Sequence, residues 1–190
     1  MLERPFVYNC VQNIFWDEAI VIELRKCLKG FETYATLELG AGTGLSSPPG
    51  FSKLTVSDIN SDYLDSISVP AKKVVCSATD LLFDDSSFDV VFAVGLFHHL
   101  DDGQFRTSLA EVRRVLRNGG VFIDLDNIWP TRITRIPAYI VRWLDRGKHV
   151  RSLSRQREMI SDIFPDLSEF VGTYSWCDLE FVRFIGKNQK

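Results

Sequence analysis

Leu37-Glu38-Leu39-Gly40-Ala41-Gly42-Thr43-Gly44 is the stretch that decides the fold of this chain. The apolar run from Ala35 to Leu39 is typical of a buried parallel strand, and three glycines at alternate positions follow it. Glycine accepts positive φ angles and has no Cβ, so the turn predicts a backbone that comes close to a ligand. The acid Glu38 stands just before the first glycine, where the strand ends.

The composition is that of an ordinary globular protein. The chain has 190 residues, a net charge of -3, 45% hydrophobic and 25% charged residues, which suits a single domain over 1–190. No apolar run approaches the roughly 18 residues that span a bilayer. The first five residues lack the basic and apolar regions of a signal peptide, so we expect a cytoplasmic protein. The four cysteines are scattered, and their spacing indicates neither a zinc site nor a disulfide framework.

The rest of the pattern predicts an α/β fold, a doubly wound, mostly parallel Rossmann-like sheet of about seven strands. Strands are expected over 33–39, 53–58, 72–77, 88–94 and 121–125, followed by an antiparallel hairpin over 170–176 and 179–186. Helices are expected over 7–28, as an N-terminal helix within 1–30, over 61–66, and from Asp101 to Leu116. Asn118-Gly119-Gly120 is a strong stop signal for the last of these helices.

Two segments depart from a standard doubly wound pattern. After the glycine turn, Pro48, Pro49 and Gly50 leave room for at most one or two helical turns, so the first crossover helix should be shortened. After the fifth strand, 131–160 is a basic helical insertion in which many arginines oppose only Asp145 and Glu158. Apolar residues lie between these arginines. An amphipathic lid over a pocket, a membrane-surface contact and a solvated helix face all remain open.

The details of the glycine turn discriminate between nucleotide-binding designs. A phosphate-binding loop needs a Lys-Ser or Lys-Thr pair, and none follows Gly44. A dinucleotide fingerprint needs a third small residue where this chain has Leu45. Glu38 would repel a pyrophosphate but attract a ligand that carries an ammonium group.

Three segments together resemble one family. Glu38 to Gly44 resembles the first motif of class I S-adenosylmethionine-dependent methyltransferases. Residues 88–100 and 111–120 are similar to the fourth-strand segment, and to the helix and turn before the fifth strand, of the subgroup that includes ubiquinone and menaquinone methyltransferases. Their order and spacing agree over about 33–125. The resemblance implies S-adenosyl-L-methionine as cofactor and methyl transfer to an oxygen, nitrogen or carbon atom of a small-molecule or lipid-linked acceptor.

The resemblance also implies cofactor contacts, several of which the residue chemistry supports. Asp58 ends the second expected strand 18 positions after Gly40, where a ribose-binding acid is expected. Ile59 would pack on the adenine face, Asp80 would accept from the exocyclic amine, and Leu81 would offer a backbone amide. Gly95 would lie near the methionine moiety. The implied cofactor-binding residues are Glu38, Gly40, Ala41, Gly42, Gly44, Asp58, Ile59, Asp80, Leu81 and Gly95.

Candidate catalytic residues are fewer. His98-His99 follows the fourth strand, where a histidine can take a proton from an acceptor hydroxyl or amine. One imidazole could instead cap the next helix or pack in the pocket wall. Alignment alone can supply much of the rate of methyl transfer, so a base is not obligatory. Asp124 and Asp126, at the end of the fifth strand, are similar candidates.

Some partners and activities are disfavoured. The fourth strand is followed by Gly95-Leu96-Phe97-His98 rather than the [DNS]-P-P-[YFW] tetrapeptide of amino-directed nucleic-acid methyltransferases, and no Pro-Cys nucleophile is present. Nucleic acid is therefore not the expected substrate. An anionic or lipid-linked acceptor fits the basic insertion, as does peripheral membrane contact through 131–160. The alternatives are a NAD-dependent oxidoreductase on a related fold, and a non-catalytic module that binds the cofactor.

Overall fold

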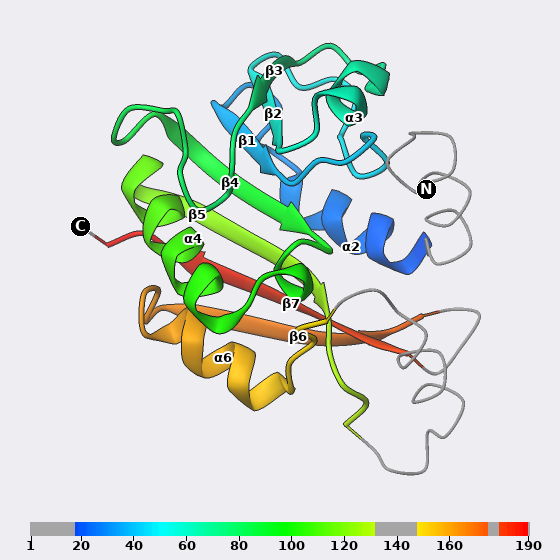
Figure 1. Cartoon of the computed structure of the whole chain (residues 1–190), viewed down its shortest axis with the longest axis vertical. Helices are drawn as coiled ribbons and strands as arrows, with labels where there is room; N and C mark the ends of the chain where they lie inside the picture. The colour runs from blue at the N-terminus through cyan, green and yellow to red at the C-terminus, as the bar shows by residue number, and fades with distance from the viewer. Residues whose placement is uncertain (1–17, 132–147, 175–178, 190) are drawn as a thin grey trace.

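A seven-stranded sheet forms the centre of the molecule (Figure 1). The computed structural model describes residues 18–131, 148–174 and 179–189. The strand order is β3-β2-β1-β4-β5-β7-β6. Strand β7 runs antiparallel to both β5 and β6, and the other neighbouring strands pair in parallel. The expected mostly parallel sheet with a closing antiparallel hairpin is confirmed. The strands are β1 Thr36–Leu39, β2 Leu54–Asp58, β3 Lys72–Val75, β4 Phe88–Val94, β5 Leu116–Asn127, β6 Leu167–Thr173 and β7 Glu180–Lys187.

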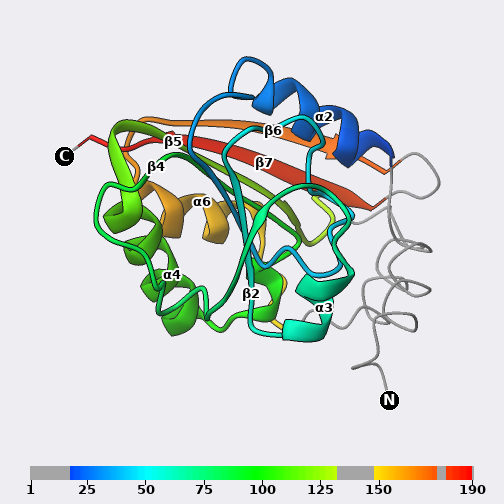
Figure 2. The ribbon, with the colours of Figure 1, turned by 90° about the horizontal axis from the view of Figure 1, so that it is seen from above.

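Helices cover both faces of this sheet. Helix α2, Glu18–Leu28, lies on one face, while α4, Asp102–Val115, and α6, Leu153–Ser161, lie on the other (Figure 2). The short helix α3, Ser61–Ser66, contributes Leu64 to the same apolar cluster as α2. The N-terminal helix was expected over 7–28, and its part before residue 18 lies outside the described residues. Within the described ranges, no helix is long and apolar enough to cross a membrane.

The crossover from β1 to β2 contains no helix. Residues 40–53, all of which the structure describes, form turns and bends, so the prediction of a shortened helix here is wrong. Pro48 and Pro49 remove two backbone donors, which disfavours helix. The segment instead closes by short-range bonds such as Ser47 N–H to the Gly44 carbonyl, 3.2 Å. This places the serines at 46 and 47 close to the end of β1.

Strand β5 begins five residues earlier than expected, at Leu116, directly after α4. The stop signal Asn118-Gly119-Gly120 lies inside the strand, which is irregular there. Asn188, near the other end of the chain, explains the difference. Its side-chain amide donates to the carbonyls of Arg113, Leu116 and Arg117 at 3.0–3.2 Å. Its backbone pairs with Gly119 and Gly120, so a distant residue holds this turn extended.

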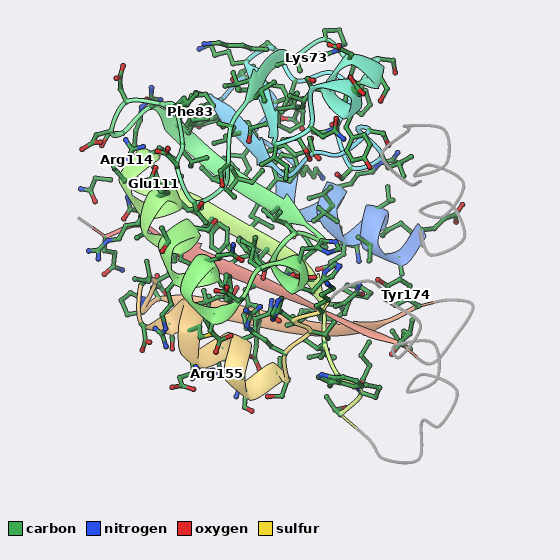
Figure 3. The ribbon with its side chains drawn as sticks, viewed as in Figure 1. Lys73, Phe83, Glu111, Arg114, Arg155 and Tyr174 are labelled. Atoms are coloured by element: carbon green, nitrogen blue, oxygen red, sulfur yellow. The ribbon has the colours of Figure 1, made fainter. Side chains whose placement is uncertain are left out.

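Arg114 and Glu111 of α4 hold the loop that follows β3 (Figure 3). The Arg114 guanidinium donates to the carbonyls of Leu81 and Phe83 at 2.9 and 2.7 Å. It also donates to Glu111 Oε1 at 2.7 Å, and this bond holds the pKa of the Glu111 carboxyl below its usual range. Residues 81–83 are therefore fixed against α4.

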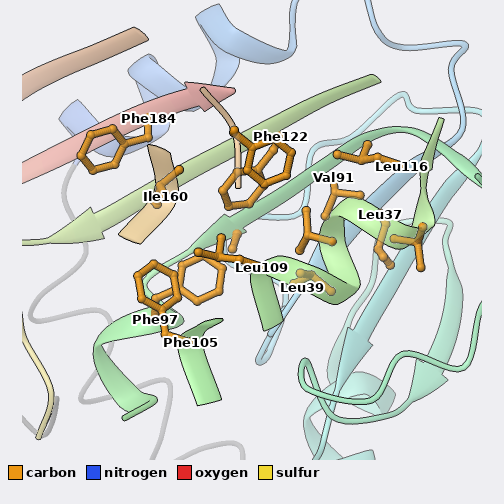
Figure 4. Packing of buried hydrophobic residues seen from close by; sticks show 14 of the residues in the cluster. Leu37, Leu39, Val91, Phe97, Phe105, Leu109, Leu116, Phe122, Ile160 and Phe184 are labelled. Carbon is orange, nitrogen blue, oxygen red and sulfur yellow. The ribbon is translucent and has the colours of Figure 1, made fainter. Parts of the chain in front are cut away.

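A cluster of aromatic rings lies between the sheet and helices α4 and α6 (Figure 4). Phe97 is fully buried, with its ring centroid 4.6 Å from that of Phe105 and 6.0 Å from that of Phe122. Phe97 begins the 3-10 turn η1, Phe97–His99, which joins β4 to α4. Burial of a phenylalanine side chain contributes roughly 1.5–3 kcal/mol, so this residue anchors the turn that carries both histidines.

Candidate cofactor and acceptor site

The carboxyl ends of β1, β2, β4 and β5 meet at one edge of the sheet. Leu39 of β1 stands in register with Ser57 of β2 and Ala93 of β4, and Ala93 with Asp124 of β5. The residues that follow these positions therefore share this edge, where open α/β sheets bind ligands. The glycine turn, Asp58, Gly95 and Asp126 all lie there.

The glycine turn has the backbone conformation that its sequence predicts. Gly40, Gly42 and Gly44 have φ angles of 63°, 52° and 83°. The structure adds a second reason for two of these glycines. A Cβ at Gly40 would lie 2.6 Å from Leu96 Cδ1, and one at Gly44 would lie 2.9 Å from Ile67 Cγ1. A side chain at 40 or 44 would therefore have to displace Leu96 or Ile67, in addition to straining the turn.

Asp58 ties the glycine turn to the end of β2. Its Oδ2 accepts from the Gly42 amide at 2.9 Å, and its Oδ1 accepts from the Asn60 amide at 2.9 Å. Each carboxylate oxygen has a second acceptor position, so both can still accept a hydroxyl. Ile59, the next residue, is 75% exposed although it is large and apolar. A fixed carboxylate beside an exposed apolar side chain suits a ribose with its attached base.

Glu38 is fully buried below the turn. One carboxylate oxygen accepts from the Ser46 hydroxyl, and the other accepts from the Ser47 hydroxyl at 2.5 Å. Burial raises the pKa of Glu38 to about 7 despite these two bonds, and the nearby charge of Asp58 adds to the shift. We did not predict either serine as a partner. The sequence offered one indication of these bonds. Both serines lie in a crossover too short for a helix, just after the strand that carries Glu38.

The loop after β3 differs from expectation in one contact. Asp80 is exposed at the end of a turn in which its amide donates to the Ser77 carbonyl at 3.1 Å. The amide of Leu81, expected to face adenine, instead donates to Glu111 Oε2 at 2.9 Å. That expectation is wrong for the amide because one N–H makes one such bond and α4 already accepts it. Nothing local in the sequence links Leu81 to Glu111.

The two histidines have different environments. His98 is buried, and its backbone amide donates to Asp126 Oδ2 at 2.9 Å while Nδ1 lies 2.5 Å from Asp126 Oδ1. Burial alone would raise the pKa of Asp126, but the charge and hydrogen bond of His98, with the Asn127 amide, hold it below its usual range. His99 is exposed, and its ring centroid lies 4.1 Å from that of His98. Asp101, rather than either histidine, caps α4.

Asp124 is a different kind of acid from Asp126. It is fully buried, its Oδ2 accepts from the Gln156 side chain at 2.8 Å, and its Oδ1 has no hydrogen-bond partner among the described residues. Burial and the charge of Asp126 raise the pKa of Asp124 well above its usual value. Burial therefore disfavours the ionised form of this carboxyl. Of the two aspartates considered, only Asp126 is placed to orient a histidine.

Tyr174 and Asn127 join the hairpin to the site edge, and the sequence did not indicate this pair. Tyr174 is 7% exposed, and its hydroxyl donates to Asn127 Oδ1 at 2.5 Å (Figure 3). Asn127 is the last residue of β5, directly after Asp126. Because β7 lies beside β5, the end of the hairpin reaches the residue next to the aspartate that binds His98.

Comparison with known proteins accounts for the central part of this architecture. Residues 37–124 match the model of a methyltransferase domain. The matched residues include the glycine turn, Asp58 and the two histidines, whereas Asp126 and Tyr174 lie beyond the methyltransferase match. A comparison with curated protein sequences returned no match.

Solved structures share the fold of the matched residues and of the residues around them. YcgJ from Bacillus subtilis aligns with a TM-score of 0.71 at 17% identity, over 91% of this chain and 99% of its own. A SAM-dependent methyltransferase from Thermotoga maritima aligns with a TM-score of 0.70 at 18% identity, over 89% of this chain and 88% of its own. The 1,6-didemethyltoxoflavin-N1-methyltransferase of Burkholderia thailandensis aligns with a TM-score of 0.71 at 15% identity, over 97% of this chain and 86% of its own. At these identities the likeness establishes the fold alone.

Proposed function

We propose that this protein is an enzyme that transfers a methyl group from S-adenosyl-L-methionine to a small-molecule acceptor. The observation that carries the proposal is the Asp58 carboxylate, bonded to the Gly42 amide at the end of β2 beside the exposed Ile59. This pair lies within the residues that match the model of a methyltransferase domain, which supports the proposal. The Burkholderia structure was solved with 1,6-didemethyltoxoflavin and S-adenosylhomocysteine, which supports both the cofactor and the small-molecule acceptor.

The contacts of Asp58 and the exposure of Ile59 and Asp80 support the following cofactor roles. Asp58 accepts hydrogen bonds from the ribose hydroxyls, Ile59 packs on the adenine, and Asp80 accepts from the adenine amine. Glu38 supplies negative charge for the ammonium group from beneath the turn. The remaining proposed contacts are backbone groups of Gly40, Ala41, Gly42, Gly44 and Gly95, with Leu81 contributing its buried side chain rather than its amide.

His98 is the proposed proton acceptor, and Asp126 orients it. With Nδ1–H donating to the ionised Asp126, the lone pair of neutral His98 is on Nε2, the nitrogen that would take a proton from the acceptor. His99, exposed beside it, is the second catalytic candidate. Four further points remain predictions from the sequence. They are the anionic or lipid-linked character of the acceptor, a lid or peripheral membrane contact over 131–160, a cytoplasmic location and a ubiquinone-type specificity.

Asp58→Asn should weaken the binding of S-adenosylhomocysteine by about tenfold to a hundredfold in titration calorimetry. The change removes the charge from two hydrogen bonds to ribose, and charge-assisted bonds contribute roughly 1.5–3 kcal/mol each. Asp84→Asn, which neutralises an exposed aspartate in the loop before β4, is the control and should bind like wild type. Failure of wild-type protein to bind at millimolar ligand, or tighter binding of NAD, would refute the proposal.

Asp126→Asn should change which ring nitrogen of His98 carries the proton. In wild type we expect the Nδ1–H form, because a buried carboxylate accepts from that nitrogen. An asparagine amide can accept or donate there, so the Nε2–H form should become populated at least tenfold more than in wild type. Nitrogen-15 correlation spectra at pH 8 measure this directly. The chain has only three histidines, so His99→Gln and His149→Gln spectra assign the signals. An unchanged His98 spectrum would contradict the proposed pairing.

A further inference from the structure

Arg151 is a buried arginine on the far side of the turn that carries the histidines. Its side chain is only 6% exposed. Nη1 donates to the Phe97 carbonyl at 2.9 Å, Nη2 donates to the Leu100 carbonyl at 2.6 Å, and Nε donates to Asp102 Oδ1 at 2.8 Å. The guanidinium carbon also lies 4.7 Å from the centre of the Phe105 ring.

These contacts need an arginine. A buried charge is costly unless it is paired and hydrogen-bonded, and here one carboxylate pairs with it and two carbonyls accept from it. The two carbonyls stand at the start of η1 and just after its end, while Asp102 begins α4. A rigid planar fork can reach all three at once, whereas the single ammonium of a lysine cannot hold the same geometry.

The backbone around Arg151 reinforces the same turn. The His149 amide donates to the His98 carbonyl at 3.0 Å, and the Trp129 amide donates to the Arg151 carbonyl at 3.0 Å. Residues 149–151 therefore run between the end of β5 and η1. The carbonyls of Phe97, His98 and Leu100 accept hydrogen bonds from these residues, while Asp126 holds His98 from the sheet.

We infer that Arg151 is a positioning residue that holds the Phe97–Leu100 turn so that the His98 ring stays against Asp126. Arg151 acts through the turn and not on the reacting atoms. Its importance for catalysis rests on the proposed role of His98, but the positioning itself is measurable without any activity. Among the described residues, the titratable groups that contact His98 include Asp126 on β5, His99 on its own turn and His149, whose amide donates to the His98 carbonyl. Asp124 lies close to Asp126, and Arg151 and Asp102 bind each other on the other side of the turn.

Arg155 supplies a matched control for this inference. It binds the other oxygen of Asp102, with Nη2 2.8 Å from Oδ2, and also binds Glu158 Oε2 at 3.0 Å. Its side chain is 41% exposed. Arg155→Met therefore removes an arginine from the same carboxylate without removing the donors to Phe97 and Leu100. Arg151→Met removes those donors as well.

The experiment compares the full-length wild type, Arg151→Met, Arg151→Lys and Arg155→Met by two NMR measurements. Amide hydrogen exchange reports on the turn through the His98 and Leu100 amides, with Phe92 and Ile123 in the central strands as references for global stability. Nitrogen-15 spectra report on the His98 ring. Titration with S-adenosylhomocysteine is run on every variant, so that loss of the cofactor site is seen separately from loss of the turn.

In Arg151→Met we expect exchange of the His98 and Leu100 amides to accelerate at least tenfold more than exchange at Phe92 and Ile123. The Nε2–H form of His98 should appear, and cofactor affinity should stay within threefold of wild type. In both its amide exchange and its His98 ring spectrum, Arg151→Lys should lie between wild type and Arg151→Met. If Arg151→Met does not fold, Arg151→Lys takes its place in the comparison.

Three results would overturn the inference. They are uniform acceleration at all four amides, an unchanged His98 ring spectrum in both Arg151 variants, or the same changes in Arg155→Met. If wild type does not bind S-adenosylhomocysteine at all, the proposed function fails while the result on the turn still stands.

Discussion

Glu38→Gln should make the protein more stable at pH 8 and flatten the pH dependence of its stability. Glu38 is fully buried, and its pKa rises from an ordinary 4.5 to about 7 in the folded protein. The folded state therefore binds the proton more tightly than the unfolded state. Between about pH 4.5 and pH 7 the free energy of unfolding should fall as pH rises, and the full cost persists above pH 7.

The size of this effect follows from the shift. A change of about 2.5 pKa units corresponds to about 3 kcal/mol, so wild type should lose up to that amount between pH 4 and pH 8. Glutamine stays neutral, and its side-chain oxygen and amide can both bond to the hydroxyls of Ser46 and Ser47. The free energy of unfolding of the variant should lack this part of the pH dependence. At pH 8 it should be about 1–3 kcal/mol larger than that of wild type.

Urea unfolding at several pH values measures the difference. Glu18→Gln, at the exposed start of α2, is the control and should leave the slope as in wild type. Comparing wild type with Glu38→Gln also tests the proposed cofactor role of Glu38. If Glu38 faces the ammonium group, wild type should release a proton on binding S-adenosylhomocysteine at pH 6.5, seen as a dependence of the binding heat on the buffer. Equal slopes in wild type and Glu38→Gln would contradict the charge state assigned to Glu38.

Gly40→Ala should destabilise the protein by about 2–5 kcal/mol. An alanine at a φ of 63° costs roughly 1–2 kcal/mol in backbone strain. Its methyl group would also lie 2.6 Å from Leu96 Cδ1, and overpacking of this kind costs roughly 1–3 kcal/mol. Binding of S-adenosylhomocysteine should weaken as well, because Leu96 lies in the loop between Gly95 and η1 and must move.

Gly50→Ala separates the two causes. Gly50 lies in the same crossover with a φ of 86°, and a Cβ there meets nothing within 4 Å. This variant should therefore show the strain alone, about 1–2 kcal/mol by urea unfolding. In a protein that already carries Leu96→Ala, the Gly40→Ala change should lower the free energy of unfolding by less than it does in wild type. The shorter side chain at 96 leaves room for the new methyl group. An equal loss in the two glycine variants would mean that Leu96 gives way without cost.

Local patterns were sufficient where the structure depends on neighbouring residues. Strand β4 has the bounds predicted for it, Phe88–Val94, because a strand covered on both faces needs a continuous apolar run. Helix α3 also has its predicted bounds, since Asn60 caps it within a short polar segment. The glycine turn and Asp58 were recognisable because strand, turn and acid follow one another at a readable spacing. The sheet class followed from the same alternation.

The tertiary structure decided what depends on residues far apart in the chain. Asn188 holds the start of β5 extended, Glu111 accepts the Leu81 amide, and Tyr174 reaches Asn127, each across dozens of positions. The sequence presented His98 and His99 as equals. Only the register of β5 against β4 places Asp126 under one of them, and Arg151 closes the turn from the other side. Sequence alone thus determined the class of sheet and the glycine turn, because both can be recognised from neighbouring residues, while the oriented histidine required side chains that meet only after folding.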